Sequence, residues 1–337
     1  MTAANPIGTS GSGIDFNDPE LEASIRAGLD AVESLLRDSV KSDYPFVTET
    51  SQHLVAAGGK RFRPLVVLLA AQFGDASAKG VVPSAVVVEL THLATLYHDD
   101  VMDEAVMRRG AVSANSRWGN TVAILTGDFL FARASDILAD LGPEAVRLQA
   151  RTFERLVQGQ IRETVGPAEH DDHVEHYLRV VADKTGSLIG TSGRFGAMLA
   201  GADEAAVEVL TRYGERIGVA FQLSDDLLDV TSDSTASGKT PGTDLREGVP
   251  TLPVLLLRRR GAPEDAELLA ALAGDLSGDA ELRSVVDQLR AHPVMAEARA
   301  VLQSWADDAR STLGPLPDAP AKAALESLCD FVVRRTG

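Results

Sequence analysis

Apolar side chains recur every three or four residues along most of the chain, which is the spacing of one face of an α-helix. Over residues 19–40 these apolar positions are Leu21, Ile25, Leu29, Val32, Leu35 and Leu36. The same spacing predicts helices over residues 64–73, 84–102, 121–141, 144–164, 172–200, 205–230, 252–259, 265–273, 280–291, 293–313 and 319–335. Neither a run of alternating strand residues nor a repeat of fixed period stands out. The pattern therefore predicts an all-α protein.

The breaks between the predicted helices are short, except over residues 231–250, which are rich in Gly, Ser, Thr and Asp. A polar loop of this length inside a compact domain is usually functional or disordered. Residues 1–15 are small and polar, lack the features of a signal peptide, and are expected to form a disordered lead-in. Since no change of composition marks a boundary, we expect one domain over residues 16–337.

Composition narrows the class of protein. Of the 337 residues, 45% are hydrophobic and only 5% aromatic, so the core must be largely aliphatic, which favours packed helices. The net charge of −17 argues against partners such as nucleic acid or an anionic lipid surface. No apolar run approaches the roughly 18 residues that cross a bilayer, so no integral membrane segment is expected. The single cysteine, Cys329, excludes a disulfide framework within the chain and fits a core position in a cytoplasmic protein.

The first group of candidate chemical residues is an acidic cluster near the end of the helix predicted over residues 84–102. Asp99 and Asp103 lie one helical turn apart on one face, with Asp100 about 100° away. Like charges at this spacing destabilise an isolated helix by roughly 0.2 to 0.5 kcal/mol per pair, so a cation is expected between them. Carboxylates without histidine or cysteine partners suit magnesium, which is commonly shared with substrate phosphates.

A second acidic cluster lies on the helix predicted over residues 205–230. Gln222, Asp225, Asp226 and Asp229 share one face, and apolar residues surround them. A solvated acidic patch is the simplest interpretation of one such cluster. Two clusters on separate apolar helices favour a metal-binding function instead.

Basic groups that could bind phosphate occur at four places. Gly58 and Gly59 precede Lys60 and Arg63, which lie one turn apart where a helix is predicted to begin at proline. The other three groups are Arg108 with Arg109, Lys184 with Thr185, and Gly238 with Lys239. Taken singly, each is most often a solvated surface charge. Arginine pairs and Gly-Lys steps are nevertheless groups that bind phosphate oxygens.

Together these segments resemble the trans-isoprenyl diphosphate synthases of the polyprenyl synthetase family, of the medium- or long-chain type, from about residue 21 to 335. The matching motifs are GGKRFRP (58–64), HLATLYHDDVMD (92–103), RRG (108–110), GDFLFARA (127–134), KTG (184–186), FQLSDDLLD (221–229) and GKTPGTDLREG (238–248). The resemblance implies an isoprenoid-synthase-type helical bundle around a central cavity, assembled as a homodimer.

The resemblance also implies a role for each motif residue. Asp99 and Asp103 would bind two magnesium ions and Asp225 a third, with manganese as an alternative metal. The residues around these ligands would be Asp100, Asp226 and Asp229, and the last two would orient metal-bound water. The allylic diphosphate would be held by Arg108, Lys184, Thr185, Gln222 and Lys239. Isopentenyl diphosphate would be held by Gly59, Lys60, Arg63, His92 and Arg109.

The implied reaction is the Mg-dependent condensation of isopentenyl diphosphate with farnesyl or geranylgeranyl diphosphate, which makes an all-trans polyprenyl diphosphate, a quinone side-chain precursor. A geranylgeranyl diphosphate synthase is the nearest alternative. A terpene cyclase needs no site for isopentenyl diphosphate, and a non-catalytic synthase subunit should lack the acidic clusters. The chain departs from many family members at Val249, where they carry a lysine.

Product length is expected to depend on the residues one turn before Asp99. Ala94 and Thr95 stand where short-chain members tend to carry aromatic residues, so we expect an open tunnel for a long tail. The alternative interpretation is that small residues here only allow two helices to pack closely.

Two further motifs have competing interpretations. His173 and His176 could form a transition-metal site, but Asp171 or Asp172 more simply caps the following helix while the histidines are exposed. Arg334 and Arg335 could close over the diphosphates, but a helix end whose dipole they compensate is the simpler account.

Overall fold

The computed structural model describes residues 16–231 and 241–335, and their contacts fall into two compact units. The first unit comprises residues 16–153, 188–214 and 313–327, and the second comprises residues 154–187, 215–312 and 328–335 within the described part of the chain. The lead-in predicted over residues 1–15 lies outside the described residues. The single domain expected over residues 16–337 remains a prediction.

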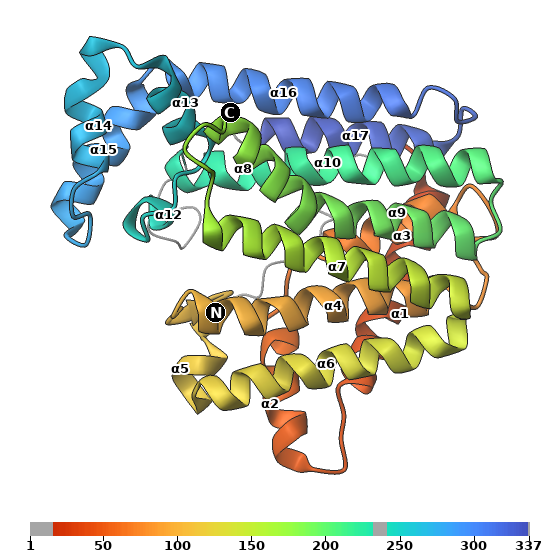
Figure 1. Cartoon of the computed structure of the whole chain (residues 1–337). Helices are drawn as coiled ribbons and strands as arrows, with labels where there is room; N and C mark the ends of the chain where they lie inside the picture. Colours follow the sequence, from red (N-terminus) through yellow and green to blue (C-terminus); the bar gives the residue numbers. More distant parts are fainter. Residues whose placement is uncertain (1–15, 232–240, 336–337) are drawn as a thin grey trace. The chain divides into compact units, whose positions relative to one another are not determined.

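The first unit is formed mainly by helices from the N-terminal part of the chain (Figure 1). Its elements are α1 (Pro19–Ser39), α2 (Pro45–Ala56), α3 (Phe62–Ala71), α4 (Val81–Met102), the hairpin of β1 (Met107–Arg108) and β2 (Ala111–Val112), α5 (Ala114–Trp118), α6 (Asn120–Leu141) and α9 (Ser187–Leu199). Parts of α7 (Pro143–Val165), α10 (Glu204–Thr231) and α17 (Pro320–Arg334) complete it. Helix α1 begins where Asp18 accepts a hydrogen bond from the backbone N–H of Leu21 at 2.8 Å, as an N-cap does.

Helix α4 forms the core of the first unit and packs against α1, α3 and α6. Every residue from Ser84 to Thr91 is buried, as expected for a helix that is apolar on all sides. Helix α6 approaches α4 closely at Gly127, where a Cβ atom would lie 2.3 Å from Nε2 of His98 and 3.1 Å from the carbonyl oxygen of Ala94. This contact fixes the last turns of α4, which carry the first acidic cluster.

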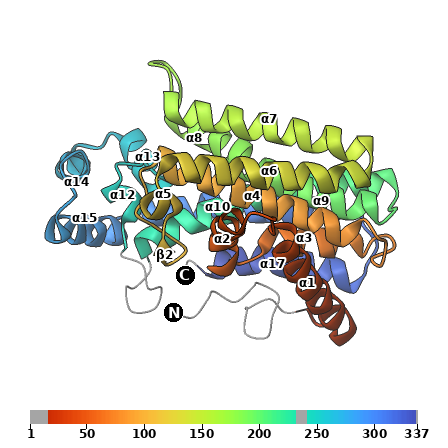
Figure 2. The same cartoon turned by 90° about the horizontal axis from the view of Figure 1, so that it is seen from below.

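The second unit contains shorter helices. Its elements are α8 (His173–Val181), a π-helical turn (Ala182–Gly186), α12 (Thr243–Arg246), α13 (Leu252–Arg260), a 3-10 turn (Pro263–Asp265), α14 (Ala266–Leu272), α15 (Asp279–Ala291), α16 (Val294–Thr312) and the remaining parts of α7, α10 and α17. Helix α13 packs against α8 and α16, and α14 lies beside α15 (Figure 2). The C-terminal half of α10 therefore carries the second acidic cluster within this unit.

The prediction of an all-α protein is confirmed, and most helix boundaries agree within a few residues. Helix α3 begins at Phe62, two residues earlier than predicted, because Pro64 fits a first turn whose N–H groups have no helical partners. The helix predicted over residues 172–200 is interrupted by the π-helical turn. The hairpin contradicts the expectation of no strands, but each strand has only two residues, too few to show alternation.

Three short helices were not predicted. Two of the four buried residues of α2, Thr50 and Ser51, are polar, so the apolar spacing does not mark this helix. Helices α5 and α12 have five and four residues, and α12 lies in the segment expected to be a loop.

Cys329 is buried, which confirms its core position. Among the described residues, no helix combines the length and apolar character that a membrane span requires.

Candidate active site

The first acidic cluster lies at the C-terminal end of α4. Asp99 is in the last turn, and Asp103 caps the helix by donating its backbone N–H to the carbonyl of Asp99 at 2.8 Å. The side chain of Asp103 is 52% exposed. Carboxylates at this end of a helix are disfavoured by the helix dipole, so the arrangement favours a bound cation.

Asp100 has a different environment from its two neighbours in the cluster. It is fully buried, and its Oδ1 accepts a hydrogen bond from Nε of Arg108 at 2.5 Å. Burial raises the pKa of Asp100, against the opposing attraction of Arg108. Its other oxygen has no hydrogen-bond partner among the described residues. Arg108 also lies 3.8 Å from Asp103, so this arginine contacts the acidic cluster in the structure.

The β1–β2 hairpin places Arg108 and Arg109. Arg109 and Gly110 form its two-residue turn with φ values of +53° and +75°, the left-handed conformation of a type I′ turn. An arginine in this conformation is strained, and such strain is often found at functional sites. Arg109 donates hydrogen bonds to the carbonyl oxygens of Gly58 and, at 3.4 Å, Leu54. The turn thus attaches Arg109 to the basic segment 58–64.

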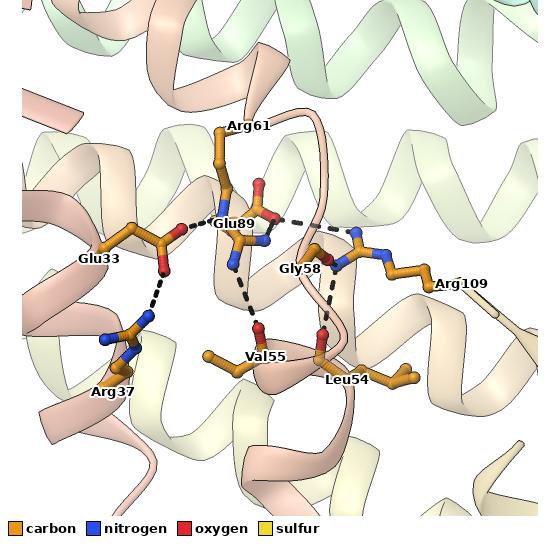
Figure 3. A network of polar contacts seen from close by, with 8 residues as sticks. All are labelled: Glu33, Arg37, Leu54, Val55, Gly58, Arg61, Glu89 and Arg109. Carbon is orange, nitrogen blue, oxygen red and sulfur yellow. Dashed lines mark hydrogen bonds and ion pairs between the residues drawn. The ribbon is translucent and has the colours of Figure 1, made fainter. Parts of the chain in front are cut away.

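The basic residues of segment 58–64 do not all face the same way. Lys60 is exposed and Arg63 is half-buried. Arg61 is turned into the core, where it pairs with Glu33 and Glu89 (Figure 3). Arg61 is not among the residues expected to bind isopentenyl diphosphate, and its buried position is consistent with that.

Positive charge is concentrated around His92. Burial and four nearby guanidinium groups hold the pKa of His92 well below its usual range, and these groups belong to Arg63, Arg109, Arg61 and Arg108. The imidazole is therefore neutral, and the surroundings favour an anion. Gly59 lies next to one of these guanidinium groups, since a Cβ atom on Gly59 would be 2.9 Å from Nη1 of Arg109. The first unit thus gathers most of the residues expected to bind isopentenyl diphosphate.

The second acidic cluster is centred on Asp226 of α10. This residue is 4% exposed and accepts hydrogen bonds from the Tyr177 hydroxyl and, at 2.9 Å, from Nε2 of Gln222. Burial raises the pKa of Asp226 to about 6, although these two hydrogen bonds act to lower it. Tyr177 had no signal in the sequence, because a tyrosine in a predicted helix is usually a packing residue.

Asp229 and Asp225 contact other segments of the second unit. The carboxylate of Asp229 accepts the backbone N–H groups of Thr243 and Asp244 at 3.1 Å each, so it anchors the start of α12. Asp225 pairs with Nη1 of Arg335 at 3.0 Å. These contacts hold α10 to the segments that follow it in the chain.

Arg335 corrects one interpretation of the sequence. Its guanidinium donates to the Ser224 hydroxyl at 2.7 Å and lies 4.2 Å above the centroid of the Phe221 ring, so it packs on α10. Arg334 donates to the carbonyl of Asp330 at 3.4 Å, as expected for a cation at a helix end. Of the two arginines expected to compensate the helix dipole, only Arg334 therefore lies as predicted.

Lys184 and Thr185 lie in the π-helical turn rather than in a regular helix. Thr185 donates to Oε1 of Gln222 at 3.2 Å, and Lys184 pairs with Glu163. Single π-helical turns occur frequently at functional sites. Lys239, the remaining expected contact of the allylic diphosphate, lies outside the described residues.

The transition-metal alternative at His173 and His176 is not supported. Asp172 caps α8 by accepting the N–H groups of Val174 and Glu175 at 2.8 and 3.1 Å. Over residues 16–231 and 241–335, no three His, Cys, Asp or Glu side chains are grouped so that they could hold a metal ion by themselves. Magnesium needs no such group, because it commonly binds one or two carboxylates together with substrate phosphates. Accessible carboxylates such as Asp103 fit that mode.

Comparison with known proteins identifies the family. A sequence model described as polyprenyl synthetase matches residues 44–289. The chain belongs to the polyprenyl synthetase family.

Relatives within this family align over nearly the whole chain. A nonaprenyl diphosphate synthase of Mycobacterium tuberculosis is 51% identical over 97% of this chain and 98% of its own length. A dimethylallyltranstransferase of the same organism is 40% identical over 95% of this chain and 98% of its own length. The crystal structure of a geranylgeranyl pyrophosphate synthase from Corynebacterium glutamicum, complexed with calcium and isoprenyl diphosphate, is 45% identical with a TM-score of 0.85 and covers 96% of this chain and all of that one.

Family membership confirms two predictions from the sequence. The chain has the all-α fold of the polyprenyl synthases, and it is a prenyl transferase of this family. The role of each individual site residue remains a prediction.

Proposed function

We propose that this polyprenyl synthetase condenses isopentenyl diphosphate with farnesyl or geranylgeranyl diphosphate to make a longer all-trans polyprenyl diphosphate, a precursor of a quinone side chain. The observation that carries the proposal is that the hairpin turn holds Arg109 against Gly58 and Gly59 of the basic segment, in the same unit as helix α4, whose C-terminal end carries Asp99 and Asp103. Basic groups in the same unit as carboxylates that include the exposed Asp103 fit a diphosphate substrate accompanied by metal ions.

The carboxylates supply the metal site in this proposal. Asp99, Asp103 and Asp225 would hold up to three magnesium ions, or manganese in their place. Bound magnesium would stabilise the negative charge that develops on the departing diphosphate. Arg108, Lys184 and Gln222 would contact the allylic diphosphate, and Lys239 is proposed for the same role from the sequence alone.

The second substrate would bind to the first unit. Gly59, Lys60, Arg63, His92 and Arg109 would bind the diphosphate of isopentenyl diphosphate and orient its double bond. When the carbon–oxygen bond of the allylic diphosphate breaks, both electrons leave with the diphosphate. The π electrons of isopentenyl diphosphate then form the new carbon–carbon bond, and loss of a proton restores a double bond. Positioned cationic groups stabilise the charge that develops during this step.

Product length is proposed from Ala94 and Thr95. Ala94 is fully buried, and Thr95 donates its hydroxyl to the carbonyl of His92 at 2.8 Å. The 51% identical relative is a nonaprenyl diphosphate synthase, which supports a long product. A geranylgeranyl diphosphate product is the second candidate, because the 45% identical structure is a geranylgeranyl pyrophosphate synthase.

One experiment separates these products. The purified protein is incubated with labelled isopentenyl diphosphate, farnesyl diphosphate and magnesium, and the products are resolved by chain length. We expect products longer than geranylgeranyl from the wild type, and shorter ones from Ala94→Phe. If the wild type stops at geranylgeranyl, the second candidate holds. An unchanged distribution in Ala94→Phe would show that Ala94 only allows α4 and α6 to pack closely.

A homodimer in the cytoplasm is part of the proposal. Exposed apolar side chains on α6, including Ile124 and Leu125, offer a surface that a second copy could cover. Light scattering after size exclusion should give twice the mass of one 35.6 kDa chain, and a monomer would contradict this part of the proposal.

A further inference from the structure

Two arginines and two glutamates form a largely buried network in the first unit (Figure 3). Glu33 comes from α1, Arg61 precedes α3, Glu89 lies in the middle of α4, and Arg109 lies in the hairpin turn. Glu89 is 2% exposed and Arg61 is 3% exposed. We call these four residues the Glu89 network.

Glu89 is the acceptor that both arginines share. Its Oε1 accepts a hydrogen bond from Nη1 of Arg61 at 2.7 Å, and Nη2 of Arg109 lies 3.9 Å from the same oxygen. Burial lowers the pKa of Arg109, the attraction of Glu89 opposes this change, and repulsion from the Arg61 guanidinium adds to it. Without the carboxylate between them, neither guanidinium could keep its present place at low cost.

All three side-chain nitrogens of Arg61 donate hydrogen bonds within the fold. Its Nε donates to Glu33, its Nη1 to Glu89, and its Nη2 to the carbonyl of Val55 at 3.4 Å. That carbonyl belongs to the last turn of α2, where cations are favoured. Arg61 therefore fixes the chain between α2 and α3, the segment that carries Lys60 and Arg63.

Arg109 also contacts this segment. Besides Glu89, it contacts the carbonyls of Leu54 and Gly58. A Cβ atom on Gly59 would lie 2.9 Å from Nη1 of Arg109 and 3.0 Å from Nη1 of Arg61, so the glycine backbone lies directly against both guanidinium groups. Glu89 thus contacts both Arg109 and the arginine that fixes segment 58–63.

We propose that Glu89 is a positioning residue for the isopentenyl diphosphate site: it holds Arg109 directly and, through Arg61, the turn that carries Lys60 and Arg63. This inference rests on the proposed function, which assigns that substrate to these residues. Glu89 offsets the charge of Arg61, which contacts it at 2.7 Å, more closely than that of Arg109 at 3.9 Å. It does not contact the substrate in this account.

Glu89→Gln tests the proposal, because glutamine keeps the shape and one acceptor oxygen but removes the charge. We expect the apparent KM for isopentenyl diphosphate to rise at least about tenfold, whereas the KM for farnesyl diphosphate and kcat change less than about threefold. A loss of general packing would instead affect both substrates. An unchanged KM for isopentenyl diphosphate, or equal changes for both substrates, would overturn the proposal.

A double-mutant cycle tests whether Glu89 acts through Arg109. In an Arg109→Gln background, Glu89→Gln should raise the KM for isopentenyl diphosphate much less than it does in the wild type. Independent, multiplicative effects of the two substitutions would contradict the proposed linkage.

A milder variant keeps the test valid if Glu89→Gln does not fold. Glu33→Gln removes only the outer partner of Arg61 and should raise the same KM to a smaller extent. Arg37→Gln is the matched control, because Arg37 lies 3.8 Å from Glu33 with a side chain that is 68% exposed, and it should leave both KM values unchanged. An unchanged KM in Glu33→Gln would count against the proposal.

The failure of this inference can be distinguished from the failure of the proposed function. If the wild type incorporates no isopentenyl diphosphate, the proposed function is wrong and the inference fails with it. If the wild type is active but its selective dependence on Glu89 is absent, only the inference is wrong.

Discussion

The two acidic segments have nearly the same sequence pattern but different surroundings. In each, the second aspartate of an Asp-Asp pair is buried: Asp100 is fully buried and Asp226 is 4% exposed. The residue that ends each segment differs more. Asp103 caps α4 and is about half exposed, whereas Asp229 accepts two backbone N–H groups at the start of α12.

Aspartates at the same spacing in two segments can therefore have different contacts and different roles. A carboxylate whose oxygens accept backbone N–H groups has less capacity for a metal or for water. Asp103 at the end of the first segment is therefore more accessible than Asp229 at the end of the second, whose carboxylate holds the start of α12. Each segment also has its own arginine, Arg108 for the first and Arg335 for the second.

The largest expected effect is common to both segments. Asp99→Asn and Asp225→Asn should each lower kcat about 1,000-fold, because charge stabilisation of the leaving diphosphate is lost. The helical circular dichroism should remain. Asp30→Asn, at an exposed position of α1, is the control and should leave kcat unchanged. Near-normal rates with magnesium in either variant would remove that segment from the active site.

The second prediction concerns pH and the buried carboxylate of the second segment. The pKa of Asp226 is about 6 in the folded chain, above its ordinary value of 3.8, so the folded state binds the proton more tightly than the unfolded state. The free energy of unfolding should therefore fall by about 2 to 3 kcal/mol as the pH rises from 4 to 7. In the Asp226→Asn variant this fall in the free energy of unfolding between pH 4 and 7 should be absent. Denaturation of the metal-free proteins across this range measures it, and parallel curves for the two proteins would contradict it.

The smallest effect distinguishes the last residue of each segment. Asp229→Ala should lower the free energy of unfolding by about 1 to 2 kcal/mol, because α12 loses the acceptor at its start. Asp103→Ala should leave it unchanged or raise it slightly, since a negative charge at a helix C-terminus is unfavourable. Calorimetry of both variants checks the contrast, and equal losses would show that the difference in surroundings has no energetic meaning.

The helical fold could be predicted because most helices bury an apolar face of regular spacing. Helix α2 could not, since polar Thr50 and Ser51 are among its buried residues. The π-helical turn that carries Lys184 joins α8 directly to α9 with no loop between them, so the pattern indicated one continuous helix.

The sequence motifs predicted the residues of the candidate site, but they did not predict the buried contacts between Arg61 and Glu89. Arg61 stands between Lys60 and Arg63 in the sequence, but its left-handed backbone, with φ of +50°, turns it into the core. Its partner Glu89 is a single acidic residue in a buried apolar run, which carries no motif. Tertiary packing alone shows that these two charges belong together.

The proposed function requires that Asp99 and Asp225 each contribute to the binding of an allylic diphosphate with magnesium. The most direct measurement is calorimetric binding of farnesyl thiodiphosphate, an unreactive analogue, with magnesium and with a chelator. The wild type should bind it only with magnesium, and Asp99→Asn and Asp225→Asn should each weaken binding at least about tenfold, or about 1.4 kcal/mol. Equal affinity with and without magnesium, or full affinity in either variant, would contradict the claim.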